Sequence, residues 1–331
     1  MDELERRIRA ANPLPTVRNA PLSARAEAEL QALVATKPMR TEPTPIHRRP
    51  RYARSLLGGM VAALVIGVLI VTGNVVQGPS ASADGLAILE QTPIDGTIGD
   101  IIDGMIMASR ANTGPGSSSK RKISFESWSA NITVGEDASV DVFVQPQESE
   151  RVWSDDLSGH IVSRAGSVKM GKVPKGVSEF APGDVIFEDS FGPGEYPALF
   201  PKKPPTTGSA MRTYISDALG LTDESTAGDW FKAIQDLRTD WPLTNAQNAA
   251  VLELIKTLPG VTAGAVTDRI GREGIALQTE TRVGGKFRDM LIFDSVTGLL
   301  ISAEEVYLGG VDDINLPAMT VFNYTAWRAT D

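Results

Sequence analysis

Hydrophobic positions are distributed unevenly along this chain, and the longest apolar run lies near its start. Residues 55–83 contain no charged side chain, and residues 56–76 read LLGGMVAALVIGVLIVTGNVV. A helix that rises about 1.5 Å per residue spans the roughly 30 Å hydrocarbon core of a bilayer with a run of this length. The pattern therefore predicts one transmembrane helix at residues 55–77.

Positive charge flanks this run on one side only. Four arginines precede it directly: Arg48, Arg49, Arg51 and Arg54. Because the positively charged flank of a membrane span stays in the cytoplasm, residues 1–54 are predicted to be a basic cytoplasmic tail and residues 78–331 an extracytoplasmic domain. The predicted location is the cell membrane, with a single pass, a cytoplasmic N-terminus and an extracytoplasmic C-terminus.

Two features of the apolar run have alternative interpretations. Ala-Ser-Ala at 81–83 resembles a signal-peptide cleavage site, but a signal peptide has few residues before its apolar run, so we favour an uncleaved anchor. Gly59, Ala63 and Gly67 recur every four residues, which is the spacing of a small-residue helix-dimer face. Glycine and alanine are also common in such helices without a dimer.

The tail contains two short helical patterns, at residues 2–11 and 23–36, followed by a proline-rich tether at 37–50. The second pattern places Leu22, Leu30 and Val34 on one face. It is either a weakly folded juxtamembrane helix or a helix that docks in a groove of a cytosolic partner.

Beyond the anchor, the pattern alternates between helix and strand. Apolar residues at helical spacing predict a helix over 94–106, and a flexible break follows at 111–119. Short alternating runs then predict an antiparallel meander. Its strands are 122–132, 139–145, 150–155 and 160–164. Residues 173–208 are rich in proline and glycine, and are predicted to form a long irregular connection rather than a packed element.

The C-terminal half first returns to helices and then to strands. Helices are predicted at 209–219, 223–238 and 244–258, and strands at 275–281, 287–293, 299–308 and 318–327. The strands follow one another through short turns rather than through βαβ crossovers. This order predicts an α+β fold in which helices partly cover one face of an antiparallel sheet.

Charge and composition narrow the range of functions. Residues 1–54 contain 11 lysines and arginines against six acidic residues, whereas the rest of the chain contains 21 against 35. An acidic domain argues against nucleic acid and against anionic lipid as its ligand, because binding either of them usually needs a basic face. The chain has no cysteine, which excludes disulfides, thiolate catalysis and cysteine-bound metal.

The search for catalytic chemistry finds no arrangement that predicts a site. His160 is the only histidine beyond the anchor, and no nucleophile motif or phosphate-binding glycine loop accompanies it. Asp95, Asp100 and Asp103 are interpreted as the solvated face of a helix. Glu304 and Glu305, adjacent on a strand, point to opposite faces, so they are taken as ordinary strand residues. We therefore predict no catalytic, cofactor-binding or metal site, and a core-packing role for the five tryptophans: Trp128, Trp153, Trp230, Trp241 and Trp327.

Two segments resemble a known group of proteins. The runs ELIKTLPGVTAGAVTDRIGREGIALQTE and RDMLIFDSVTGLLISAEE resemble actinobacterial single-pass membrane proteins of unknown function. In these, a helix ending in LPGV leads to a strand, a D-x-x-GR-G-A turn and an FD-x-x-TG-L-L hairpin. Their N-terminal tails begin much like MDELERRIRAANPLP.

The ectodomains of this group resemble the LolA/RseB-like superfamily. The resemblance implies a curved antiparallel sheet with helices on its concave side and an association with extracytoplasmic-function sigma factors. It also implies an apolar cavity for acyl chains; a filled core is the alternative.

These observations favour a non-enzymatic membrane protein with a regulatory or sensory, anti-sigma-like role. Its extracytoplasmic domain would bind a ligand or partner, and its tail a cytosolic protein such as a sigma factor. The alternative is a membrane-anchored module that binds lipid or lipoprotein and whose tail is passive. An extracellular hydrolase that uses His160 has the least support.

Overall fold

The computed structural model describes residues 86–111, 120–129, 131–134, 140–169, 180–311 and 318–328. The predicted cytoplasmic tail, the anchor at 55–77 with its arginines, and the face made by Gly59, Ala63 and Gly67 all lie outside these residues. Among the helices that the structure describes, none has the length and hydrophobicity needed to cross a bilayer.

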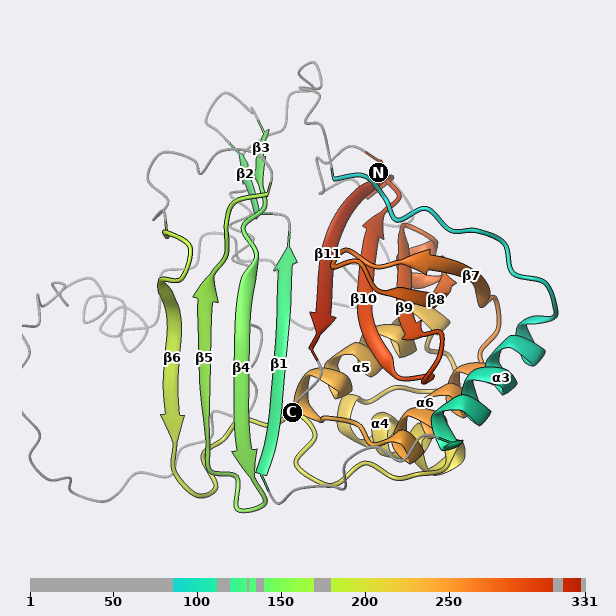
Figure 1. The fold of residues 1–331 in the computed structure, drawn as a ribbon, viewed down its shortest axis with the longest axis horizontal. Coiled ribbons are helices and arrows are strands. Elements are labelled where there is room, and N and C mark those ends of the chain that lie inside the picture. The colour runs from blue at the N-terminus through green and yellow to red at the C-terminus, as the bar shows by residue number, and fades with distance from the viewer. Residues whose placement is uncertain are drawn as a thin grey trace, which may run out of the picture. The chain divides into compact units, whose positions relative to one another are not determined.

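The fold is organised around an open antiparallel sheet of nine strands (Figure 1). The strand order is β6-β5-β4-β1-β11-β10-β9-β8-β7. The strands of the first half are β1 (Lys120–Ser129), β4 (Gln147–Ser154), β5 (Gly159–Ala165) and β6 (Val185–Phe191). Those of the second half are β7 (Thr262–Thr267), β8 (Glu273–Thr279), β9 (Phe287–Asp294), β10 (Leu300–Tyr307) and β11 (Thr320–Trp327). A separate hairpin joins β2 (Asn131–Val134) to β3 (Val140–Phe143).

The two halves of the sheet meet where the first strand of the domain pairs with the last. Phe125 of β1 lies opposite Trp327 of β11, and the two strands run antiparallel. An N-terminal meander and a C-terminal meander therefore share one open sheet, joined by the pairing of β1 with β11. The predicted antiparallel α+β architecture is confirmed.

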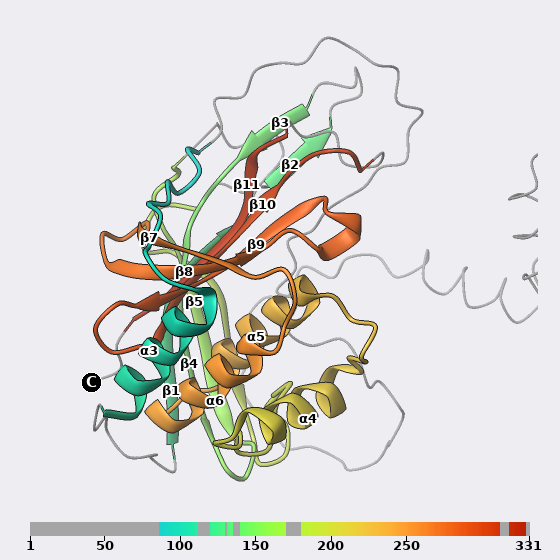
Figure 2. The same cartoon turned by 90° about the vertical axis from the view of Figure 1, so that its right-hand side faces the viewer.

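Four α-helices lie together on one side of the described sheet (Figure 2). They are α3 (Ile98–Ala111), α4 (Gly208–Leu219), α5 (Ala227–Asp240) and α6 (Asn245–Lys256). Local hydrogen bonds set where two of them begin: Thr226 and Thr244 each form a capping box, with Asp229 and Gln247 as the third residues of the helices. The four predicted helices are present, but two have different bounds: α3 covers Ile98–Ala111 rather than 94–106, and α5 begins at Ala227 rather than at residue 223.

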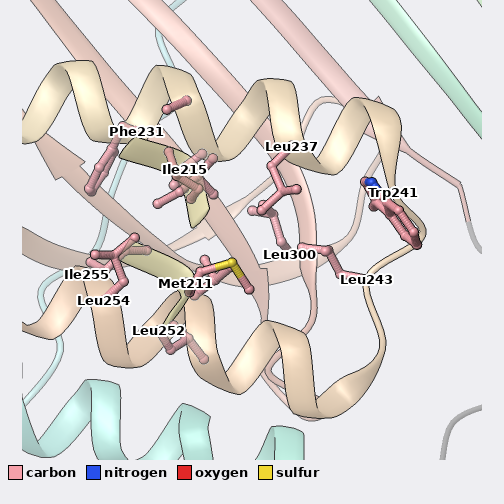
Figure 3. Close-up of a cluster of buried hydrophobic side chains, with 14 of the residues drawn as sticks. Met211, Ile215, Phe231, Leu237, Trp241, Leu243, Leu252, Leu254, Ile255 and Leu300 are labelled. Atoms are coloured by element: carbon pink, nitrogen blue, oxygen red, sulfur yellow. The ribbon is translucent and has the colours of Figure 1, made fainter. Parts of the chain in front are cut away.

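The main core fills the layer between these helices and the sheet (Figure 3). Helices α4, α5 and α6 and strand β10 contribute large apolar side chains with almost no exposed surface: Met211, Ile215, Phe231, Leu237, Leu252, Leu254, Ile255 and Leu300. The five tryptophans are buried as well, which confirms the packing role predicted for them. Burying such side chains stabilises a fold by about 1.5–3 kcal/mol each.

Two strands correct the expectations from sequence. The prediction that residues 173–208 form no packed element is wrong for β6, which pairs with β5, and for Tyr196 and Phe200, which are buried in the main core. Proline and glycine flank β6 so densely that they obscure its short apolar pattern. The periodicity of the sequence also fails to predict β7, because its sequence TAGAVT is dominated by small residues. The resemblance implies a strand there.

Candidate functional site: the entry strap and its contacts

The first described residues cross the face of the sheet that lies opposite the helices. We call residues 86–92 the entry strap and this face the outer face (Figures 1 and 2). Leu86 and Ile88 pack on one outer-face cluster: Trp128, Val144, Val321, Tyr324 and Ala326. Leu89 packs on a second cluster: Val266, Ala276, Met290 and Ile292. Without the strap, both apolar clusters would lose part of their cover.

The strap then closes one edge of the sheet. The amide of Thr92 donates to the carbonyl of Ala265 over 2.9 Å, and the amide of Ala265 donates back over 2.8 Å. Beside this bridge, Gln91 occupies a notch that exists because residue 264 is glycine: a Cβ there would lie 2.7 Å from Gln91 Oε1. Strand β7 is an edge strand, and edge strands offer unpaired backbone groups. Here the strap satisfies part of that edge.

A buried ion pair ties the strap to the middle of the sheet. Arg269 Nε lies 2.6 Å from Glu304 Oε2, and the Glu304 side chain is fully buried. The same guanidinium donates through Nη2 to the carbonyl of Ala87 over 3.0 Å. Burial raises the pKa of Glu304, and the positive charge of Arg269 opposes this shift. One network therefore runs from a buried carboxylate to the backbone of the strap.

The turn before β8 is held by a second ion pair. The carboxylate of Asp268 accepts hydrogen bonds from the amide of Arg272 over 2.9 Å and from its Nε over 2.8 Å. Arg272 also donates to the carbonyls of Trp327 and Ile301. Gly271 adopts a φ of 87°, which favours glycine. The D-x-x-GR motif thus has a structural role: it locks the β7–β8 turn onto β10 and β11.

The FD-x-x-TG motif has an equally local explanation. The Asp294 carboxylate accepts hydrogen bonds from the amide of Thr297 over 2.7 Å and from its hydroxyl over 2.7 Å. Gly298 closes the turn with a φ of 65°. These residues form the tight turn between β9 and β10 that the sequence predicts, and neither motif presents a reactive group.

The strap and the β7–β8 hairpin together line an open pocket of about 610 Å³. Its lining comes from the strap, both strands and the β9–β10 turn: Glu90, Thr92, Ala265, Val266, Thr267, Glu273, Gly274, Ile275 and Ser295. The two charged residues of this lining, Glu90 and Glu273, are both acidic. The pocket therefore suits a polar or cationic group better than an acyl chain. Within the described part of the chain, no group of histidine, cysteine or acidic side chains is arranged to hold a metal ion.

The acidic residues singled out in the sequence do not converge on one point. Asp100 accepts a hydrogen bond from the hydroxyl of Thr97 at the start of α3, and Asp103 forms an ion pair with Lys256. His160 is half-exposed on β5, where its Nδ1 lies 3.0 Å from Ser190 Oγ. Asp100 and Asp103 are exposed on α3, in agreement with their interpretation as helix-surface residues, whereas Asp95 is exposed but precedes the helix.

The expectation for Glu304 and Glu305 needs one correction. They do point to opposite faces, since Glu305 pairs with Arg282 on the helix side over 2.9 Å. They are not ordinary strand residues, however, because both are buried in ion pairs. Arg282 also binds Asp289, and burial raises the pKa of Asp289 to about 6 despite these hydrogen bonds. Sequence alone missed this cluster because its members come from separate strands and turns.

Stacked aromatic and cationic side chains fill the helix side of the first half of the sheet. The guanidinium carbon of Arg121 lies 4.1 Å from the ring centre of Trp153 and 4.2 Å from that of Trp241. Tyr196 stacks on Trp153 with ring centres 5.4 Å apart. It lies over Gly159, where a Cβ would approach within 2.4 Å of the tyrosine ring. These side chains pack against the helix side of β1, β4 and β5.

The fold and the site together define an α+β domain with an open antiparallel sheet and no recognisable catalytic centre among the described residues. No protein-family model matches the chain. A search of curated proteins finds no match either. A solved structure of a DUF1329 family protein from Desulfovibrio piger is similar at 10% identity, over 69% of this chain and 90% of that chain, with a TM-score of 0.18. A score this low does not assign a family.

Proposed function

We propose that this protein is a non-enzymatic, single-pass membrane regulator of the anti-sigma type. In this proposal, the extracytoplasmic domain binds an envelope ligand or partner, and the cytoplasmic tail at 1–54 binds a cytosolic protein. The observation that carries the proposal is the entry strap. The residues that follow the predicted anchor are built into the outer face and the β7 edge of the sheet, so a change at that edge would reach the chain that leads to the anchor.

The pocket beside the strap supports the sensory half of the proposal. Its lining includes Glu90 and Thr92 of the strap as well as Glu273 of β8. An occupant would touch the strap and the sheet at once, and would therefore favour one arrangement of the strap over another. A ligand shifts such an equilibrium only if it binds the two arrangements with different affinity. A ligand that contacts Glu90 or Thr92 as well as Glu273 would lose part of its contacts if the strap moved.

The proposed binding of a cytosolic protein by the tail is supported by the resemblance and by the net charge of residues 1–54. Proteins with similar tails are associated with extracytoplasmic-function sigma factors, and the tail here carries a net positive charge. The helical pattern at 23–36 offers an amphipathic face for such a partner. We also propose that the extracytoplasmic domain is a member of the LolA/RseB-like superfamily.

The proposal is tested by crosslinking in intact cells that express either the full chain or a chain without residues 1–54. We expect a specific cytosolic protein to be captured only when the tail is present, and we expect tail deletion to change the transcription of a defined set of genes. The proposal fails if neither effect is found. Lipid that co-purifies with the domain, together with no effect of tail deletion, would instead indicate the anchored lipid-binding module.

A further inference from the structure

Two exposed hydrophobic residues stand in an unfavourable backbone conformation at one end of the sheet. Among the described residues, three that are not glycine have positive φ: Leu157, Val283 and Met319. Val283 and Met319 are also exposed, at 55% and 45%. A β-branched residue with positive φ is a marked outlier, and such strain persists only where the surrounding structure enforces it.

The turn between β8 and β9 enforces this conformation. Val283, Gly284 and Gly285 are left-handed in succession, with φ values of 51°, 64° and 82°. Arg282, immediately before them, is held by Asp289 over 2.8 Å on the helix side of the sheet. A glycine or asparagine at position 283 would satisfy this turn with less strain. The turn requires a positive φ at position 283, but it does not require a valine. The exposed valine therefore adds backbone strain that another residue would avoid.

Met319 lies at the same end of the sheet as Val283. Leu308 donates its amide to the carbonyl of Lys286 over 2.8 Å, and Met319 donates its amide to the carbonyl of Tyr307 over 2.7 Å. The β8–β9 turn and the start of β11 are thus joined through the end of β10. An apolar cluster supports this end from within the fold: Phe287, Tyr307, Val311 and Phe322. Lys286 belongs to this end as well, and a Cβ at Gly310 would lie 2.6 Å from its Nζ.

The described chain also enters the domain at this end (Figure 1). Leu86 packs on the outer-face cluster, whose β11 members extend from Val321, two residues beyond Met319, to Ala326. Residues 78–85 separate Leu86 from the predicted anchor, and eight residues span at most about 30 Å when fully extended. The opposite end of the sheet is about 26 Å farther away, which is the length of an eight-residue strand, so turning that end to the bilayer would require an almost fully extended connection. The short connection therefore favours an orientation in which the end with Val283 and Met319 faces the membrane.

We propose that Val283 and Met319 contact the interface of the membrane that holds the anchor. Their side chains enter the headgroup region of the bilayer. The occupant of this surface is a lipid interface rather than a protein, because the connection brings that surface close to the bilayer. This inference rests on the proposed anchor at 55–77, and it adds a membrane contact that positions the domain.

The absence of cysteine from the whole chain makes the test simple, because one introduced cysteine provides a unique label. Val283→Cys and Met319→Cys in the full chain receive an environment-sensitive fluorophore. Val296→Cys serves as the matched control: Val296 is 76% exposed and lies in the β9–β10 turn at the other end of the sheet. Each protein is reconstituted into phosphatidylcholine vesicles with a fraction of phosphatidylglycerol, and nitroxide-labelled lipid is added as quencher.

We expect several-fold stronger quenching and a blue-shifted emission at positions 283 and 319 relative to position 296. Equal quenching at all three positions would overturn the inference. Flotation of the vesicles reports the anchor separately. A chain that floats but shows no selective quenching refutes the membrane contact alone, whereas a chain that does not float refutes the anchor and the contact that depends on it. The two labelled positions lie in different turns, so a folding defect in one leaves the other as a test.

Discussion

Removing Arg269 should destabilise the domain strongly, because the change leaves Glu304 buried without its ion pair. The Glu304 side chain is fully buried and that of Arg269 is 16% exposed. Breaking a buried pair by removing one partner costs about 3–5 kcal/mol. Whole domains are stabilised by only about 5–15 kcal/mol, so Arg269→Ala removes a large share of the total. For a domain of this size, we expect the melting temperature to fall by about 6–20 °C.

Urea unfolding of residues 78–331, followed by circular dichroism, measures this loss. Arg288→Ala is the matched control, because Arg288 lies 2.7 Å from Glu280 in a pair whose glutamate is 47% exposed. Such a surface pair contributes about 0–1 kcal/mol. A loss for Arg269→Ala no larger than that for Arg288→Ala would refute the reasoning.

The dependence of this loss on pH gives a second check. Burial already raises the pKa of Glu304, and removing Arg269 removes the charge that opposes this rise. A carboxyl whose pKa is higher in the folded than in the unfolded state binds more protons when folded, so the folded state loses stability as pH rises through that interval. We expect the deficit of Arg269→Ala to be smaller near about pH 5 than near about pH 8. An equal deficit at both pH values would show that the lost charge pairing is not the cause.

Three further predictions follow from single positions. Gly264→Ala should displace the strap, lower the free energy of unfolding by about 1–3 kcal/mol and speed hydrogen exchange at the Thr92–Ala265 bridge. Gly104→Ala is the control, because a Cβ there meets nothing within 4 Å, and it should change neither quantity. Asp289→Asn should flatten the pH dependence of the free energy of unfolding. Because the pKa of Asp289 in the folded domain is about 6, the wild-type domain loses roughly 2–3 kcal/mol of stability as pH rises from about 4 to about 7. An unchanged slope in the variant would contradict this. Val283→Asn should raise the melting temperature by a few degrees in calorimetry, since it relieves about 1 kcal/mol of left-handed strain; a lower melting temperature would show that the valine packs rather than strains.

Much of the fold could be predicted because its elements are specified locally. The α5 and α6 helices begin at residues whose side chains cap their own first turn, so short sequence patterns are enough to find them. The turn after Asp294 is equally local, since its hydrogen bonds join residues at most three positions apart. Periodicity does not predict β6 and β7, because proline and glycine surround the first and small residues dominate the second. Pairing with a neighbouring strand defines both.

The candidate site could not be predicted in the same way. Arg269 and Glu304 are 35 positions apart, and the strap contacts residues more than 180 positions away. Nothing in the local sequence distinguishes Glu304 from Glu305, yet Glu304 pairs with Arg269 on the outer face and Glu305 with Arg282 on the helix side. Only the three-dimensional packing decides which polar residue is buried and which partner it has.

The sequence by itself determined the alternation of helices and strands, the charge asymmetry around residue 54, and the two turns carried by the glycine motifs. These features depend on interactions within a few residues or on composition. The tertiary structure decided that β1 pairs with β11, that the entry strap closes the β7 edge, and that Val283 and Met319 share one end of the sheet. These features depend on contacts between segments far apart in the chain, where long-range pairing and burial rather than local propensity set the free energy.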